Sequence, residues 1–155
     1  MKTPRSLLSL LLILSLAACG QEPAAESNEM LVYKTPQCGC CSVWVDYIEE
    51  AGFEVEARDV SHQELNEIKR EAGLPFSLGS CHTAFVDGYV VEGHVPAEQV
   101  HRLLEERPDI LGIAVAGMPI GSPGMEMGDR KDPYEVLTFN DEGESEVFAR
   151  YHQEE

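Results

Sequence analysis

In this chain of 155 residues, the fold is indicated most clearly by the stretch Tyr33-Lys-Thr-Pro-Gln-Cys-Gly-Cys-Cys41. Residues 30–34 are apolar and aromatic, which predicts a short strand, and the turn Thr35-Pro-Gln37 follows it. Beyond the turn, four residues recur at spacings of three and four: Cys41, Trp44, Val45 and Ile48. This spacing predicts one buried face of a helix. The stretch therefore predicts a strand, a turn and a helix whose first turn carries cysteines.

The elements that follow continue this pattern. Residues 53–57 alternate between apolar and polar, which predicts a second strand, and Ser61-His-Gln-Glu64 is a capping box that begins a second helix. Asp87-Gly88, between two apolar runs, is a strong signal for a hairpin. Pro96 suits the first turn of a third helix. The predicted order is strand, helix, strand, helix, hairpin, helix.

This order predicts an α/β protein in which a right-handed βαβ unit is followed by a ββα unit. A Cys-x-x-Cys pair that begins a helix directly after a strand makes residues 30–109 resemble a thioredoxin-like fold. Residues 110–132 have little periodicity and many Gly and Pro residues, and residues 135–139 and 146–151 predict a second hairpin. We therefore expect residues 110–155 to form a Met/Gly/Pro-rich loop and a hairpin extension outside the thioredoxin core.

The start of the chain has the features of an export signal. Lys2 and Arg5 precede an apolar run at 7–16, which is too short to span a bilayer as a permanent helix but suits a signal-peptide core. Leu16-Ala-Ala-Cys19 resembles the lipobox of bacterial lipoproteins, in which a peptidase cuts before a cysteine that carries lipid. An ordinary signal peptide with a chance cysteine is the alternative.

The lipobox resemblance implies that residues 1–18 are a lipoprotein signal peptide and that Cys19 is lipidated. Residues 19–29 have no apolar period and are predicted to be a flexible tether. The residue after Cys19 is Gly20 rather than the Asp that retains lipoproteins in the inner membrane. We therefore expect a lipid anchor on the periplasmic side of a bacterial membrane, the outer membrane.

The charge of the chain limits its partners. Lys and Arg number 11 against 28 Asp and Glu, which gives a formal net charge of −17. A chain this acidic is repelled by nucleic acid and by anionic lipid headgroups, so we expect no nucleic-acid partner and a membrane contact only through the lipid at Cys19.

Four thiols remain once Cys19 is lipidated: Cys38, Cys40, Cys41 and Cys81. Because an exported protein enters an oxidising compartment, these thiols must form disulfides, act in catalysis or bind a metal. A helix N-terminus favours the thiolate, which both attacks disulfides and binds metals. Cys40 would invite wrong pairings in a disulfide-exchange enzyme, whereas it is one more ligand for a soft metal.

Cys81 supports the hypothesis of a metal site. Thioredoxin-like folds keep a cis-proline packed against the Cys-x-x-Cys pair at the position where this sequence has Cys81-His82. We therefore expect the fold to bring a fourth thiol to the other three. A buried core cysteine at this position, and a plain structural disulfide among the other three, are the alternatives.

Several motifs together resemble one family of exported, thioredoxin-like metal-binding proteins, long catalogued only as a domain of unknown function, which includes the CopG-type copper-resistance proteins. The motifs are Tyr33-Lys-Thr-Pro-x-Cys-Gly-Cys-Cys41, Ser80-Cys-His-Thr83, Asp87-Gly-Tyr89, Glu92-Gly-His-Val-Pro96 and Gly117-Met-Pro-x-Gly-Ser-Pro-Gly-Met125. The resemblance extends over roughly residues 30–151 and implies copper binding and copper resistance.

The ligand types favour Cu(I), since thiolate and thioether groups select this soft ion. Thiolates as crowded as Cys38, Cys40 and Cys41 suit a polynuclear Cu(I) cluster better than one tetrahedral zinc ion. Further candidate ligands are the thioethers and imidazoles of Met118, Met125, Met127, His82 and His94. The alternatives are that the methionines only pack and that His94 is a turn residue.

The sequence thus predicts a periplasm-facing lipoprotein that holds Cu(I) on clustered thiolates in copper resistance or homeostasis, with a copper-efflux or copper-handling protein as partner. The alternative function is a thiol–disulfide oxidoreductase that uses Cys38 and Cys41. A third hypothesis is a lipoprotein whose thiols only form two disulfides. The sequence does not indicate whether catalysis occurs.

We predict that the mature chain begins at a lipidated Cys19, because Leu16-Ala-Ala-Cys19 follows a short apolar run. Mass spectrometry of the N-terminal peptide from the native protein measures this. An unmodified terminus at any other residue would contradict the prediction.

Overall fold

The computed structural model describes residues 28–153. The predicted signal peptide, the lipidation of Cys19 and most of the tether lie outside these residues. The tether boundary is one residue too long, because Glu29 already belongs to the first strand, where it pairs with Glu54. Within residues 28–153, no helix has the length and apolar character that a membrane span needs.

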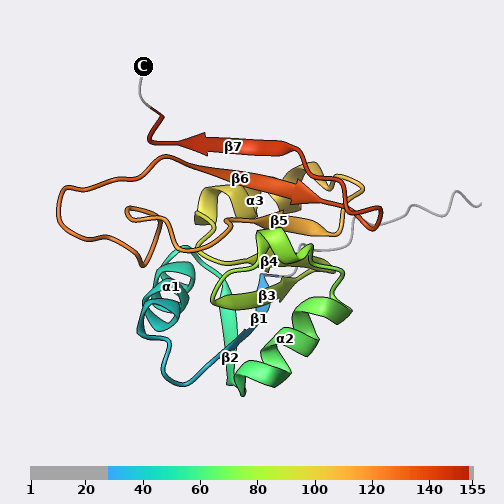
Figure 1. Cartoon of the computed structure of the whole chain (residues 1–155), viewed down its shortest axis with the longest axis horizontal. Coiled ribbons are helices and arrows are strands. Elements are labelled where there is room, and N and C mark those ends of the chain that lie inside the picture. The colour runs from blue at the N-terminus through green and yellow to red at the C-terminus, as the bar shows by residue number, and fades with distance from the viewer. Residues whose placement is uncertain (1–27, 154–155) are drawn as a thin grey trace, which may run out of the picture.

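The strands of the described chain form one mixed sheet in the order β2-β1-β3-β4-β5-β6-β7 (Figure 1). Their bounds are β1 Glu29–Lys34, β2 Glu54–Asp59, β3 His82–Val86, β4 Tyr89–Glu92, β5 Gly112–Ala114, β6 Tyr134–Phe139 and β7 Val147–Tyr151. β1 runs parallel to β2 and antiparallel to β3, and β4 runs antiparallel to β3 and parallel to β5. From β1 to α3, the elements follow one another along the chain in the predicted order of strand, helix, strand, helix, hairpin and helix, apart from the short 3₁₀ helix before β3.

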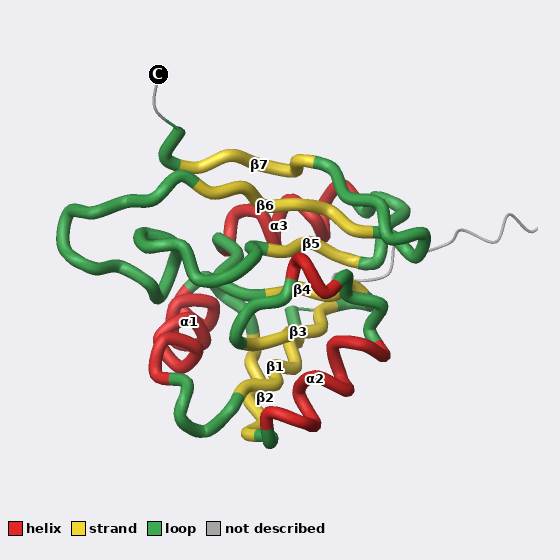
Figure 2. The backbone as a smooth tube through the Cα atoms, in the orientation of Figure 1, coloured by secondary structure: helices red, strands yellow, loops and turns green. Residues whose placement is uncertain are grey.

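Helices cover both faces of the sheet, as Figure 2 shows. α1 (Gly39–Glu50) and α3 (Ala97–Glu106) pack on one face, and α2 (His62–Glu71) with the short 3₁₀ helix Phe76–Leu78 packs on the other. The Ser61 half of the predicted capping box forms, since the Glu64 amide donates to the Ser61 hydroxyl at 3.2 Å. The βαβ and ββα units are therefore those of a thioredoxin-like fold.

The main core lies between the sheet and the pair α1 and α3. Its fully buried side chains include Trp44, Ile48, Val100, Leu103, Val32, Ala84, Val91 and Ile113. Burial of such apolar surface contributes about 25 cal/mol per Å² and fixes the helices on the sheet. A smaller apolar cluster, on the α2 side, contains Leu78, Val90, Ala114 and Phe139.

The C-terminal extension differs from the prediction, because it continues the same sheet. β5 lies in the segment expected to be irregular, between β4 and β6, and all three of its residues are buried. A strand this short that is buried on both faces shows no alternation, so periodicity misses it. The predicted hairpin forms as β6 and β7, and Tyr134 and Val136 of β6 join the main core.

Gly112 shows how closely β5 approaches β4. A Cβ at this position would lie 2.0 Å from the carbonyl oxygen of Val90, so no side chain fits. We predict that Gly112→Ala lowers the free energy of unfolding by about 2 kcal/mol or more, since the strand backbones must move apart. Urea denaturation measures this.

The matched control is Gly39→Ala, because a Cβ there has no atom within 4 Å. Alanine is also the better helix former, so the stability of this variant should stay the same or rise slightly. Equal stability of the Gly112→Ala variant and the unchanged protein would contradict the close approach.

Candidate metal centre

The first turn of α1 carries the cysteine cluster. Cys38 is the N-cap of the helix, and its amide donates to the Thr35 carbonyl at 3.1 Å. Cys38 and Cys41 form a disulfide, whereas Cys40 and Cys81 are free. The four sulfur atoms lie within 4.8 Å of one another, and the Sγ atoms of Cys38 and Cys40 are 3.6 Å apart. This confirms the expectation that the fold brings Cys81 to the other three cysteines.

The register between β1 and β3 explains why Cys81 arrives there. Lys34, the last residue of β1, is paired with His82, the first residue of β3. Cys81 therefore stands beside the turn that leads from β1 into α1. The Cys81-His82 segment occupies the predicted position without a cis peptide, since residues 28–153 contain none.

Two buried imidazoles complete a second group of ligands around Cys81. The Cys81 Sγ lies 3.1 Å from His94 Nε2 and 3.4 Å from His82 Nδ1. His94 Nδ1 lies 2.8 Å from the Pro123 carbonyl, which can only accept, so Nδ1 carries the proton and Nε2 has its lone pair toward Cys81. Cys81, His82 and His94 thus form a set whose ligand atoms are within 4.8 Å.

His82 is enclosed completely. Its ring lies 4.3 Å from the Trp44 ring, measured between centroids, and it meets His94 edge to face. Its Nε2 is buried without a hydrogen bond of normal geometry to any described residue. One ring nitrogen of His82 is thus buried without such a hydrogen bond, and the other lies against Cys81. The imidazole can therefore serve as a metal ligand.

Burial sets the protonation of this group. Together with the nearby Cys40, burial raises the pKa of Cys81 to about 12, and the Ser80 hydroxyl opposes the rise. Burial also lowers the pKa of His94, and it lowers that of His82 well below its usual range, with further lowering from the electrostatic interactions of His82 with His94 and Lys69. The Gly93 backbone opposes the shift of His82. Neutral imidazole binds metals directly, whereas the Cys81 thiol must first lose its proton.

The segment 117–125 covers the cysteine-bearing start of α1. Gly124 lies so close to α1 that a Cβ would be 3.0 Å from the Cys40 carbonyl oxygen and 3.0 Å from the Trp44 amide nitrogen. The Pro123 carbonyl holds His94 from the same loop. The loop therefore closes over the first turn of α1 and over the imidazole at once.

The three predicted methionine ligands differ in their surroundings. Met125 directly follows Gly124 and is half-buried, and its amide donates to the Ser122 carbonyl at 2.8 Å. The side chains of Met118 and Met127 are 52% and 63% exposed. Of the three, Met125 is the one that the fold holds next to residues packed on α1.

Sequence reasoning missed a buried ion pair beside Cys81. Lys69 of α2 pairs with Glu92, whose side chain is fully buried at the end of β4. Burial raises the pKa of Glu92, and Lys69 opposes this rise. A carboxylate within the apolar run of β4, directly before Gly93, was the available signal, but the sequence does not show which cation reaches it.

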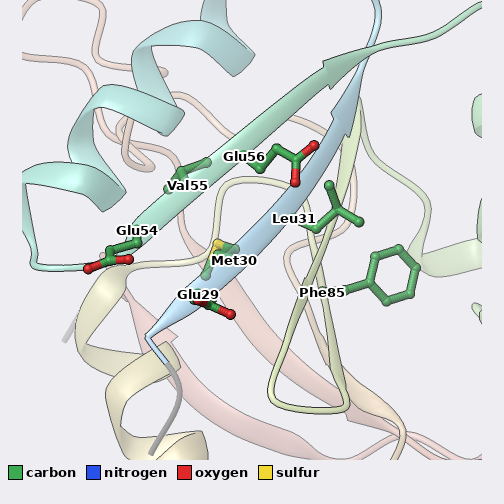
Figure 3. A pocket seen from close by; sticks show the side chains of 7 residues that line it. All are labelled: Glu29, Met30, Leu31, Glu54, Val55, Glu56 and Phe85. Atoms are coloured by element: carbon green, nitrogen blue, oxygen red, sulfur yellow. The ribbon is translucent and has the colours of Figure 1, made fainter.

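A separate hollow of about 510 Å³ opens on the sheet (Figure 3). It is lined by Glu29, Met30, Leu31, Glu54, Val55, Glu56 and Phe85. It lies at the beginning of β1, whereas the cysteines gather beyond the end of that strand. Carboxylates are hard ligands, and the lining has no cysteine or histidine and a single soft donor, Met30, which is buried in the main core, so the hollow does not compete as a soft-metal site.

Fold and site define a thioredoxin-like α/β protein with thiols and imidazoles suited to a soft metal at the start of its first helix. Residues 78–125 match the family described as "Protein of unknown function, DUF411". The solved structure "Copper resistance protein copG", Form 1, has 43% identity and a TM-score of 0.76, over 82% of this chain and 98% of that chain. Form 2 has 45% identity and a TM-score of 0.74, over 79% and 97%. A comparison with curated proteins finds no significant match.

The chain therefore belongs to the CopG family of copper-resistance proteins. The resemblance that the sequence motifs indicated is confirmed, and so is the thioredoxin-like fold. The DUF411 match begins at Leu78 and ends at Met125, so it spans Cys81, both buried histidines and the covering loop.

We predict that Cys81 reacts slowly with iodoacetamide at pH 8 in metal-free protein with the Cys38–Cys41 disulfide intact. With a pKa of about 12, the thiolate fraction is so small that alkylation should be on the order of a thousandfold slower than in an unstructured peptide. Because the thiolate fraction grows with pH below the pKa, the rate should rise about tenfold per pH unit.

Peptide mapping by mass spectrometry follows Cys81 separately from Cys40. Alkylation of a urea-unfolded sample gives the reference rate for Cys81 itself. A Cys81 rate at pH 8 close to that reference in the folded protein would contradict the buried, neutral thiol.

Proposed function

We propose that this protein holds Cu(I) on the thiolates of Cys38, Cys40, Cys41 and Cys81, in copper resistance or homeostasis. The observation that carries the proposal is the convergence of four sulfur atoms within 4.8 Å, one of which also contacts two buried imidazoles. Membership of the CopG family supports copper as the metal.

The chemistry of the donor set supports Cu(I) in particular. Thiolate is a soft ligand and imidazole binds copper well, whereas the site offers no carboxylate among its grouped ligand atoms. Cys81 belongs both to the group of four cysteines and to the group with His82 and His94. A thiolate shared between two groups of ligands suits a bridge, so we infer that more than one Cu(I) is bound.

The Cys38–Cys41 disulfide links copper binding to the redox state. A disulfide must take up two electrons and two protons to give two thiols, and these must lose their protons to bind metal. The oxidised protein therefore offers only the thiols of Cys40 and Cys81 beside the histidines. We infer that reduction completes the ligand set, and that bound copper then protects the four cysteines from oxidation.

The cellular setting is part of the proposal. We infer that lipid on Cys19 anchors the protein to the periplasmic face of the outer membrane. We also infer that the protein passes Cu(I) to a copper-efflux or copper-handling protein, or converts the copper for such a protein. The lipobox-like ending at Cys19 and the family's copper-resistance role support this setting.

A second function is favoured by the disulfide itself. Cys38 is half-buried at the start of α1, whereas Cys41 is fully buried, on a thioredoxin-like scaffold. In thiol–disulfide exchange the accessible thiolate attacks and the enclosed thiol resolves the mixed disulfide. Cys38 would then attack a substrate and Cys41 would release it.

We predict that the anaerobically reduced protein binds more than one Cu(I) per molecule. Titration against a chromogenic Cu(I) chelator gives the stoichiometry, and copper-edge X-ray absorption should show copper–copper scattering. A single bound ion, with zinc preferred over Cu(I), would overturn the cluster.

Single Cys→Ser variants separate the two functions. If the thiolates bridge one cluster, serine at Cys38, Cys40, Cys41 or Cys81 should lower the copper stoichiometry to a similar degree. Val43→Ser, on the exposed face of the same helix, is the matched control and should bind copper normally.

The same variants are assayed for insulin reduction. An oxidoreductase should lose activity with Cys38→Ser, form trapped mixed disulfides with Cys41→Ser, and tolerate Cys40→Ser. Full copper retention without Cys40 and Cys81, together with loss of reductase activity without Cys38, would favour the second function.

A further inference from the structure

We propose that the buried Lys69–Glu92 pair is a positioning device that fixes Cys81 as a metal ligand. This inference rests on the proposed copper binding. It adds two residues that are not themselves proposed as metal ligands. Glu92 and Lys69 act through the backbone and hydroxyl groups on either side of Cys81.

Glu92 holds both ends of the segment that contains Cys81. Its Oε1 accepts a hydrogen bond from the Ser80 amide at 2.6 Å, directly before Cys81. Its Oε2 accepts from the Thr83 hydroxyl at 2.7 Å, directly after His82. One carboxylate therefore clamps the four residues 80–83, whose middle pair are Cys81 and His82.

Lys69 makes the clamp possible. A carboxylate buried without a partner would be costly, and Lys69 Nζ supplies the opposite charge from α2. Lys69 also donates to the Thr83 hydroxyl at 2.8 Å, which leaves that oxygen's own proton for Glu92. Hydrogen bonds to a charged acceptor are stronger than neutral ones, so the pair holds Ser80 and Thr83 more firmly than an amide would.

The clamp also ties Cys81 to its imidazole neighbour. Glu92 and His94 are separated only by Gly93, whose amide donates to the His82 carbonyl at 3.1 Å. A Cβ on Gly93 would lie 2.5 Å from the Ser80 hydroxyl oxygen, so the two segments are in direct contact. The distance from Cys81 Sγ to His94 Nε2 is therefore set by the same few hydrogen bonds.

The test compares three proteins with the unchanged chain. Lys69→Met with Glu92→Leu removes both charges and the acceptor, and apolar replacement of a buried pair is often neutral for stability. Lys69→Met with Glu92→Gln removes the charges but keeps one acceptor oxygen for the Ser80 amide and an amide N–H group that can donate to the Thr83 hydroxyl. Arg70→Met with Glu71→Gln is the control, since it removes an exposed ion pair from the same helix.

Two measurements are made on each folded protein. Iodoacetamide alkylation of Cys81, with Cys40 as internal reference, reports the position of the thiol in metal-free protein. Competition with a Cu(I) chelator reports the affinity. We expect Lys69→Met with Glu92→Leu to raise the Cys81 rate about tenfold and to weaken Cu(I) binding by about 10- to 100-fold, as for other residues that orient metal ligands. The glutamine variant should recover most of both losses, and the control should show neither.

Unchanged Cys81 reactivity and copper affinity in the folded leucine variant would overturn the proposal, and so would a loss of affinity without a change at Cys81. If that variant does not fold, Thr83→Val replaces it, because it removes the hydroxyl at one end of the clamp; wild-type behaviour of Thr83→Val would then refute the clamp. If the unchanged protein binds no copper, the proposed function fails, whereas the alkylation rates still decide the positioning.

Discussion

The antiparallel pairing of β1 with β3 is the constraint on which the site depends. It places the end of β1 opposite the beginning of β3, with Lys34 beside His82. The chain enters α1 shortly after Lys34, so the cysteines of that helix lie next to Cys81 in space, although they are far from it in the sequence. Burial of Val32 and Ala84 in the main core holds this register, because a slip by one residue would turn both side chains to the other face.

The interior around the cysteines carries little charge, which suits it to a soft cation. The imidazoles of His82 and His94 are buried and their pKa values are lowered, and burial keeps Cys81 a neutral thiol. The exception is the Lys69–Glu92 pair, which is balanced internally. A metal that binds here displaces protons from thiols, so affinity, protonation and the state of the disulfide are coupled.

The C-terminal third of the chain contributes to the site by close packing. β5 extends the sheet from β4, and the segment after it returns across α1, where Gly124 contacts the backbone of Cys40. The residue directly after β7 contacts that segment, since His152 Nε2 lies 3.3 Å from the Gly121 carbonyl. The extension and the thioredoxin-like part thus form one structure around the cysteines.

The order of elements and the cysteines at the start of α1 follow from the sequence alone, because helical spacing, capping and the hairpin signal are local. The approach of Cys81 was expected from the resemblance to thioredoxin-like folds, whose cis-proline position Cys81-His82 occupies. The tertiary structure decided that His82 and His94 both face Cys81, that β5 joins the sheet, and that Lys69 reaches Glu92. It also left Met118 and Met127 exposed. These features depend on strand register and on close approach between distant segments, and no local periodicity in the chain encodes such contacts.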